Sequence, residues 1–162
     1  YEDGLAAYLS FLDGSRHKLR VAVYSYTEKA DTDKLIYLHQ HGIKDIKVLV
    51  DKSQAVSRSG KYQQEQIQSL RAEGIETVIG TSEKRHQIMH LKFTVRDDDW
   101  TEDGSWNYTK SANYQDNNLN FTHSRKRAAQ FTAIWDRMYL FMKNQDQTPW
   151  DKTDNNPNQE SQ

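Results

Sequence analysis

Hydrophobic residues in the first half of the chain recur with two periods, one typical of helices and the other typical of strands. Helical spacing predicts three helices, each followed by a glycine stop signal, over residues 5–12, 31–41 and 61–72. Runs rich in β-branched and aromatic residues predict three strands, over residues 19–26, 46–50 and 75–79. This alternation of helices and strands indicates an α/β layer with right-handed parallel crossovers.

The hydrophobic pattern changes to strict alternation between Gln87 and Val95, which predicts a strand with two distinct faces. On one of these faces His90 and Lys92 are neighbours. An acidic run at residues 97–99 ends the strand. The pattern then predicts a short return, a glycine turn, a short helix, another strand and a long helix, over residues 100–103, 104–107, 109–114, 119–122 and 128–141.

Taken together, these elements predict an α/β fold with a mixed, largely parallel β-sheet flanked by helices on both faces. The sequence has no linker and no internal repeat, so we expect a single domain over residues 1–144. From Gln145 onward the composition becomes polar and includes both prolines. We interpret residues 145–162 as a disordered C-terminal tail.

Composition excludes several classes of protein. The chain has 162 residues with 22 Lys+Arg against 23 Asp+Glu, and this formal net charge of -1 excludes a global polycation. Hydrophobic residues make up 35% and the mean hydropathy is -1.00, so one chain has little apolar material beyond a modest core. No apolar run approaches the roughly 20 residues needed to cross a bilayer. The absence of cysteine excludes disulfides, cysteine-ligated zinc and thiol catalysis.

The side chains best suited to chemistry lie in two short segments, His90-x-Lys92 and Gly104-Ser105-Trp106-Asn107. Cleaving a phosphodiester without a metal ion requires a nucleophile for phosphorus, donors for the non-bridging oxygens and an acid for the leaving oxygen. Histidine can attack or donate a proton near neutral pH, and the Lys92 ammonium can neutralise phosphate charge. Ser105 and Asn107 offer a hydroxyl and an amide to the same oxygens. These four side chains predict a site for one phosphate group.

At these residues the sequence resembles the phospholipase D superfamily. The superfamily signature H-x-K-x-x-x-x-D, followed by G-S-x-N, is matched by His90, Lys92, Asp97, Gly104, Ser105 and Asn107. The chain looks like the small, single-motif bacterial endonucleases and mitochondrial cardiolipin hydrolases of that superfamily over roughly residues 5–141. Residues 21–27 and 48–54 support the resemblance. It implies a phospholipase D-like fold.

The resemblance also implies a role for each residue of the catalytic set His90, Lys92 and Asp97. His90 attacks phosphorus to form a phosphohistidine, and a second motif histidine protonates the leaving group and later activates water. Because this chain has one motif, the resemblance implies a homodimer with a shared active site, to which each chain contributes its His90. Lys92, Ser105 and Asn107 bind the phosphate. We expect Asp97 to hold the site through hydrogen bonds or salt bridges rather than to react.

One departure from the superfamily pattern concerns the glutamate that usually follows the G-S-x-N turn and orients the motif histidine. Counting without a gap puts Asn118 at the glutamate position, and a one-residue slip puts Asn117 there. Asp116 is a third candidate if the loop is displaced. An amide accepts a hydrogen bond from imidazole but supplies no charge to stabilise imidazolium, so we expect a less basic histidine than in relatives.

Two further groups of residues have alternative interpretations. Three basic clusters, residues 16–18, 84–86 and 125–127, either line a groove for a polyanion or are solvated loop ends. Trp106 and Tyr108 either stack on a base of the substrate or belong to the core.

We therefore predict a dimeric, metal-independent phosphodiesterase that acts as a nonspecific endonuclease on DNA or RNA and leaves a 5′-phosphate. The sequence shows no metal-ligand spacing and no phosphate-loop glycines, so we expect neither a metal nor another cofactor. The alternatives are a lipid phosphodiesterase of the cardiolipin-hydrolase kind and a nucleic-acid-binding member with a weakened site. Since the chain begins at Tyr1 rather than at methionine, we expect a periplasmic or secreted protein if a leader was removed, and a cytoplasmic one otherwise.

Overall fold

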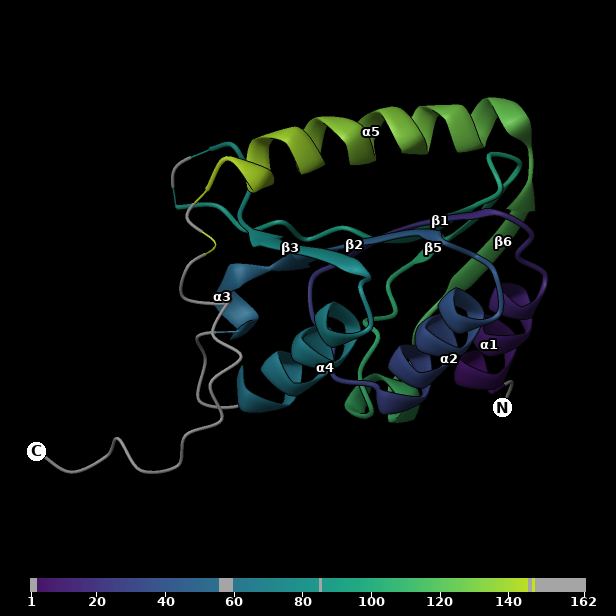
Figure 1. The fold of residues 1–162 in the computed structure, drawn as a ribbon, viewed down its shortest axis with the longest axis horizontal. Helices are drawn as coiled ribbons and strands as arrows, with labels where there is room; N and C mark the ends of the chain where they lie inside the picture. The colour runs from purple at the N-terminus through teal and green to yellow at the C-terminus, as the bar shows by residue number, and fades with distance from the viewer. Residues whose placement is uncertain (1–2, 56–59, 85, 146, 148–162) are drawn as a thin grey trace, which may run out of the picture.

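Six strands form one mixed sheet in the order β3-β2-β1-β4-β5-β6, with helices packed above and below it (Figure 1). The strands are β1 to β6, at Lys18–Val23, Asp45–Asp51, Glu76–Gly80, Lys92–Arg96, Trp100–Gly104 and Leu119–His123. The computed structural model describes residues 3–55, 60–84, 86–145 and 147. The predicted α/β fold with a mixed sheet is confirmed.

The connections between strands decide which pairs are parallel. β1 with β2 and β2 with β3 are parallel, because a helix crosses over between the members of each pair. β4 is antiparallel to β1 and to β5, and β5 is antiparallel to β6. The three residues that join β4 to β5 allow only an antiparallel pair. The expectation of a largely parallel sheet therefore holds for β1 to β3 and not for the β4 to β6 half.

Helices cover both faces of the sheet, as predicted. Three helices, α1, α2 and α4, cover one face (Figure 1), and they span Gly4–Asp13, Lys29–Gln40 and Gly60–Ala72. α5, at Arg125–Lys143, lies along the opposite face. Two shorter elements were not predicted with these bounds, the four-residue helix α3 at Lys52–Ala55 and the 3-10 helix η1 at Ser111–Tyr114. A single turn is too short for a hydrophobic period to reveal.

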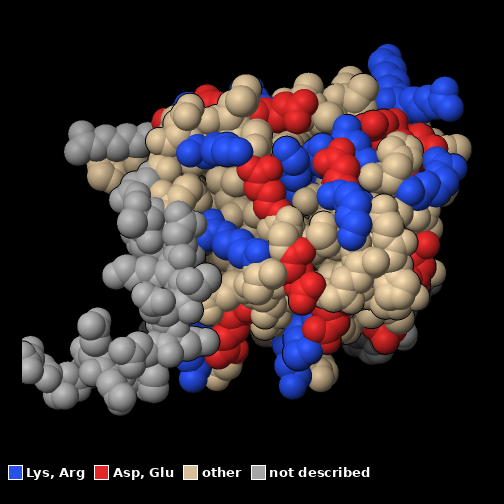
Figure 2. Space-filling model, viewed as in Figure 1, with Lys and Arg blue, Asp and Glu red and all other residues tan. Residues whose placement is uncertain are grey.

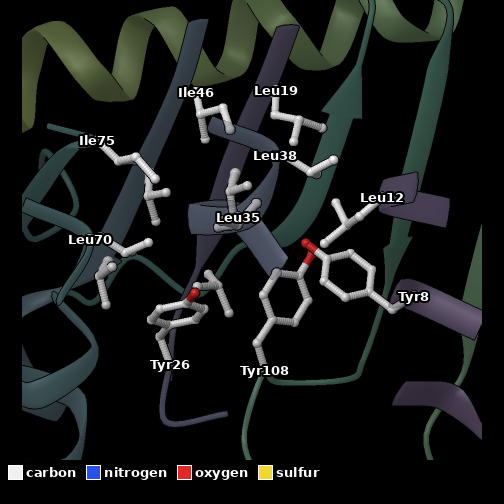
Figure 3. Close-up of a cluster of buried hydrophobic side chains, with 14 of the residues drawn as sticks. Tyr8, Leu12, Leu19, Tyr26, Leu35, Leu38, Ile46, Leu70, Ile75 and Tyr108 are labelled. Carbon is white, nitrogen blue, oxygen red and sulfur yellow. The ribbon is translucent and has the colours of Figure 1, made fainter. Parts of the chain in front are cut away.

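Each face of the sheet has its own core. The cluster under α1, α2 and α4 includes Tyr8, Tyr26 and Tyr108, and the Tyr108 ring lies between the other two (Figure 3). On the other face the buried residues of α5 follow helical spacing, and the Trp135 Nε1 donates to the Val21 carbonyl oxygen at 2.8 Å. Burying a side chain of this size stabilises the fold by roughly 2 kcal/mol. One core on each face fixes the strand register that positions the candidate site.

The strand predicted to start at Gln87 begins only at Lys92. The residues before it leave the strand ladder because the backbone N–H of Met89 donates to the buried carboxylate of Asp51 instead. His90 therefore lies in an irregular segment that leads into β4. The alternation of polar and apolar residues continues through this segment, but the regular strand pairing begins only at Lys92.

The predicted tail, residues 145–162, lies outside the described residues except at its start. Gln145 and Gln147 are described, and both contact the β3 side of the sheet. The Gln147 amide donates to the Ile79 carbonyl oxygen at 2.6 Å and accepts from the Ile79 N–H at 3.0 Å. The Gln147 amide therefore pairs with the β3 edge as a neighbouring backbone would.

Candidate active site

His90 and Lys92 lie where β1 and β2 end and β4 begins. His90 is exposed, whereas Lys92 is 9% exposed and lies at the first position of β4. The Lys92 Nζ is 3.1 Å from the His90 Nε2 and donates to the His90 carbonyl oxygen, also at 3.1 Å. A charged ammonium only donates, so the Nε2 accepts and the imidazole carries its proton on Nδ1. The fold thus brings together the two residues that the sequence predicts to meet.

The Tyr24 ring contacts both of these side chains, although the sequence did not single it out. Its centroid is 4.7 Å from that of the His90 ring, in an edge-on arrangement, and 5.4 Å from the Lys92 Nζ. The Tyr24 hydroxyl accepts from the Gln54 Nε2 at 2.7 Å. Tyr24 falls in the segment 21–27 that supported the resemblance, so a signal was present, but that signal indicated no role for this residue.

The surroundings of His90 favour the neutral form of its imidazole. Burial lowers the pKa of His90, the positive charge of Lys92 lowers it further, and the negative charge of Asp51 acts in the opposite direction. Burial also lowers the pKa of Lys92. A neutral imidazole beside an ammonium is suited to attack an electrophile whose negative charge the ammonium offsets.

Ser105 and Asn107 lie on the turn that follows β5. β5 ends at Gly104, and its Asp103 pairs with Phe93, the residue after Lys92, so Ser105 and Asn107 follow β5 at the end where β4 begins. Asn107 is half-buried, and its side-chain oxygen has no hydrogen-bond partner among the described residues. Both polar residues therefore lie near the ends of the strands where His90 is found.

The candidates for the missing glutamate contact the turn rather than the histidine. Asn117 accepts from the Ser105 hydroxyl at 2.9 Å, and the Asn118 N–H donates to the same hydroxyl at 3.1 Å. Asp116 is exposed. Among the described hydrogen bonds, none joins any of these three residues to His90. Which of them orients the histidine, if any does, stays a prediction.

Replacing Asn118 with glutamate, or Asn117 in a second variant, is expected to raise the rate of phosphodiester cleavage roughly tenfold if that position contacts His90. The added carboxylate stabilises the imidazolium, so both limbs of the pH–rate profile should move upward by about one unit. Asn118→Gln is the matched control without charge. If both glutamate variants keep the wild-type rate and pH profile, neither position reaches the histidine.

Asp97 lies at the other end of β4, five residues or about 16 Å from Lys92 along the strand. Its buried carboxylate accepts from the backbone N–H groups of Arg16, His17 and Lys18 at 2.8, 2.9 and 3.0 Å. Asp97 has a positive φ of 53° in the β4–β5 turn. Asp97 therefore anchors the segment that leads into β1, at the opposite end of β4 from the phosphate-binding residues, and its part in holding the site stays a prediction.

The Asp97→Asn variant is expected to lose about 1–3 kcal/mol of unfolding free energy, because a buried acceptor of three N–H groups loses its charge and one oxygen. Asparagine tolerates the positive φ, so backbone strain does not confound the result. Asp98→Asn, at the exposed next position, should change stability by at most about 0.5 kcal/mol. Chemical denaturation checks both values, and a fall in kcat at unchanged stability would contradict the holding role.

One of the three basic clusters, residues 16–18, lies at the Asp97 end of the sheet, remote from His90. Arg16 and Lys18 form ion pairs with the acidic run at residues 97–99. Arg127, at the start of α5, pairs with Asp103. On the face shown in Figure 2, basic and acidic side chains are interspersed rather than separated. Arg16 and Lys18 therefore do not line a groove beside the predicted phosphate site, whereas Asp103, the partner of Arg127, pairs across the strands with Phe93, next to Lys92.

Trp106 and Tyr108 are core residues, at 2% and 0% exposure. Both rings pack on Tyr8, and the Tyr108 hydroxyl also contacts Thr94 and Glu102. Burial on both sides of Asn107 anchors the turn that carries it. The core interpretation is confirmed for this aromatic pair.

The described part of the chain contains neither a membrane-spanning helix nor a cluster of metal-ligating side chains. No helix there is long and apolar enough to cross a membrane. No group of three or more His, Cys, Asp or Glu side chains there is placed to hold a metal ion.

Comparisons with known structures agree with this fold. The structure of Nuc from Salmonella typhimurium, a phospholipase D family member, superposes with a TM-score of 0.74 at 23% identity, covering 84% of this chain and 86% of that one. NucT from Helicobacter pylori gives 0.68 at 18%, covering 86% and 89%. Phosphatidylserine synthase from Haemophilus influenzae Rd KW20 gives 0.63 at 13%, covering 82% of this chain and 34% of that one. At these identities the likeness shows a shared fold.

Sequence comparison identifies the family directly. No curated protein sequence matches this chain. The family model described as "Cardiolipin synthase, PLD-like domain" matches residues 8–139, a range that contains every predicted site residue. Because that match covers most of the chain, the protein belongs to the phospholipase D-like (PLD-like) domain family.

Proposed function

We propose that this protein is a metal-independent phosphodiesterase that acts as a nonspecific endonuclease on DNA or RNA. The observation that carries the proposal is the 3.1 Å contact between the His90 Nε2 and the Lys92 Nζ, where β1 and β2 end and β4 begins. A neutral imidazole and an adjacent ammonium are the two groups that attack on a phosphodiester requires. Ser105 and Asn107, on the neighbouring turn, supply further polar groups for the phosphate oxygens.

The proposed reaction has two steps, and the proton transfer in the second step runs opposite to that in the first. In the first, His90 of one protomer attacks phosphorus, a nitrogen–phosphorus bond forms, and the bond to the 3′ oxygen breaks. The partner's His90 gives that oxygen its proton. In the second, the partner imidazole takes a proton from water, the water oxygen attacks phosphorus, and the nitrogen–phosphorus bond breaks. The products are a 3′-hydroxyl and a 5′-phosphate, and both histidines return to their starting state.

A homodimer is part of the proposal because each chain has a single histidine motif. The two roles in the reaction need two histidines, and a two-fold axis near His90 would supply the second one. The low apolar content of the chain supports the same assembly, since an interface adds burial that one chain lacks. Sedimentation and gel filtration test this part, and an active monomer would contradict it.

A lipid phosphodiesterase is the second candidate. The matching family model carries the description of a cardiolipin synthase domain, and a phosphatidylserine synthase shares the fold. The reaction at phosphorus would be the same, with a lipid alcohol as leaving group. The third candidate, a nucleic-acid-binding member with a weakened site, rests on the asparagines at the glutamate position.

One assay separates the three candidates. Purified protein is incubated in EDTA with plasmid DNA, RNA and cardiolipin vesicles, beside a His90→Ala variant purified in parallel as a control for contaminating nuclease. EDTA-resistant cleavage of nucleic acid that the variant lacks, with ends that ligase rejoins without a kinase, supports the endonuclease. Turnover of lipid alone supports the second candidate, and phosphate-sensitive binding of nucleic acid without turnover supports the third.

A further inference from the structure

The corner where β2 meets α3 contacts the backbone before His90 and the ring beside it. We propose that Asp51 and Gln54, at this corner, are positioning residues for the catalytic histidine, and that Asp51 supplies the carboxylate that the sequence lacks after the G-S-x-N turn. The inference deepens the proposed function and rests on it.

Asp51 is fully buried at the last position of β2. One carboxylate oxygen, Oδ2, accepts from the Met89 N–H at 2.6 Å, and the other accepts from the Ser53 N–H at 2.8 Å and from the Ser53 hydroxyl. Met89 is adjacent to His90 in the chain and is itself buried. A short bond from a buried carboxylate therefore fixes the backbone that carries the histidine.

Gln54 provides the second contact, through Tyr24. The Gln54 amide donates to the Tyr24 hydroxyl, and the Tyr24 ring contacts both the His90 ring and the Lys92 ammonium. α3 follows β2 without a break, so Asp51 and Gln54 lie in one short continuous segment (Figure 1). Two independent contacts from one corner thus converge on the histidine, one through its backbone and one through its ring.

The charge of Asp51 distinguishes it from a merely structural partner. Three groups face His90 from the elements around it: Lys92 from β4, Tyr24 from the end of β1, and Asp51 from the end of β2. Lys92 and burial lower the pKa of His90, and Asp51 is the group that raises it. A carboxylate that favours imidazolium has the electrostatic effect that the missing glutamate has in relatives.

The decisive variant is Asp51→Asn, which keeps the shape and an acceptor for Met89 but removes the charge. We expect kcat for a soluble phosphodiester substrate to fall roughly 10- to 100-fold, with KM within about threefold. Losses of this size are typical when a histidine loses the carboxylate that orients it. Both limbs of the pH–rate profile should move to lower pH, because His90 loses its stabilising anion. Asp45→Asn is the matched control: it makes the same change at the start of the same strand, about 20 Å away, and should keep the wild-type profile.

A second variant and a second measurement keep the test decisive if Asp51→Asn folds poorly. Tyr24→Phe removes the hydroxyl that Gln54 holds, and it should lower kcat severalfold with little change in the melting temperature. NMR titration of the His90 imidazole reads its pKa without any turnover, and that pKa should fall in Asp51→Asn.

The outcomes distinguish a failure of the proposed function from a failure of the role proposed for Asp51. If the wild-type protein cleaves no phosphodiester, the proposed function fails, while the NMR titration still tests Asp51. If Asp51→Asn leaves both the His90 pKa and the pH–rate profile at their wild-type positions, Asp51 is a purely structural residue and the inference is wrong. The same holds if Asp45→Asn moves them equally.

Discussion

Replacing His90 with alanine should reduce phosphodiester cleavage by roughly a thousandfold or more, because the variant loses the nucleophile in one chain and the acid in the other. The Lys92 ammonium and the turn that carries Ser105 and Asn107 remain, so binding of the substrate phosphate should persist. Initial rates in EDTA against binding measured by fluorescence anisotropy would show this separation. The control is His39→Ala, on α2 toward the far end of the sheet, which should keep full activity.

Mixing the His90→Ala variant with wild-type protein tests the shared site directly. Random pairing in an equal mixture leaves roughly one quarter of the dimers with two histidines, so activity per wild-type chain should fall by about half. Sites that work within single chains would instead keep the full activity of every wild-type chain. Refolding the two proteins together from denaturant ensures exchange, and retention of full activity per wild-type chain would contradict a site built from two chains.

A second large effect is expected at Glu102, a fully buried carboxyl group in the core below the Asn107 turn. It accepts from the Tyr108 hydroxyl at 2.5 Å. Burial raises the pKa of Glu102 to about 8, against an ordinary 4.5; the Tyr108 hydrogen bond opposes the rise and the charge of Asp103 adds to it. Burial also raises the pKa of Asp31, whose two carboxylate oxygens have no hydrogen-bond partner in the described structure. The core therefore favours the protonated form of both acids.

The sign of the pH dependence follows from these raised pKa values. Below about pH 4.5 Glu102 is protonated in both the folded and the unfolded chain, and its stabilising effect is fully present. As pH rises to about 8 the unfolded chain releases the proton and the folded chain retains it, so the free energy of unfolding declines. Above that range both states are ionised and no further loss arises from this group.

Glu102→Gln is therefore expected to stabilise the protein at pH 8.5 by about 2–4 kcal/mol and to have little effect at pH 4.5. Glutamine keeps an oxygen that accepts from Tyr108 but cannot ionise. Urea denaturation at both pH values checks this. Glu76→Gln is a control of opposite sign: burial raises the pKa of Glu76, but hydrogen bonds led by that from Lys143 outweigh it and hold it at about 2. Equal gains for Glu102→Gln at both pH values would contradict the assignment.

Much of the fold and of the reactive pair was predictable because the signals are local. Alternating residues around His90 and Lys92 place the two side chains on one face. The β4–β5 hairpin then brings Ser105 to the end of the strands where this pair lies. The support of His90 was not predictable in this way. Asp51 is a single acidic residue at a strand end, and its partner Met89 lies 38 residues away. A contact of that kind depends on how the parallel crossovers stack β2 beside β1, which no short sequence period records.

The basic cluster at residues 16–18 is an example of the opposite kind. Its charges form a clear local pattern, but that pattern does not show where the cluster lies in the fold. Residues 16–18 look like a phosphate-binding patch in the sequence. The hairpin at residues 97–99 folds against them, so Arg16 and Lys18 pair with neighbouring carboxylates. Charge along a chain does not show which end of the sheet it will occupy, and here the strand directions carry the cluster away from His90.

The Gln147 amide has a practical consequence for shortened versions of the protein. β3 is the outermost strand on its side, and an uncovered strand edge is a template for pairing with another chain. Gln147 occupies the N–H and C=O of Ile79 on that edge. A version truncated at residue 144, where composition alone would place the end of the domain, removes this cover. Self-association of such a protein would then report pairing between strand edges, and it would be mistaken for the dimer that shares the histidines.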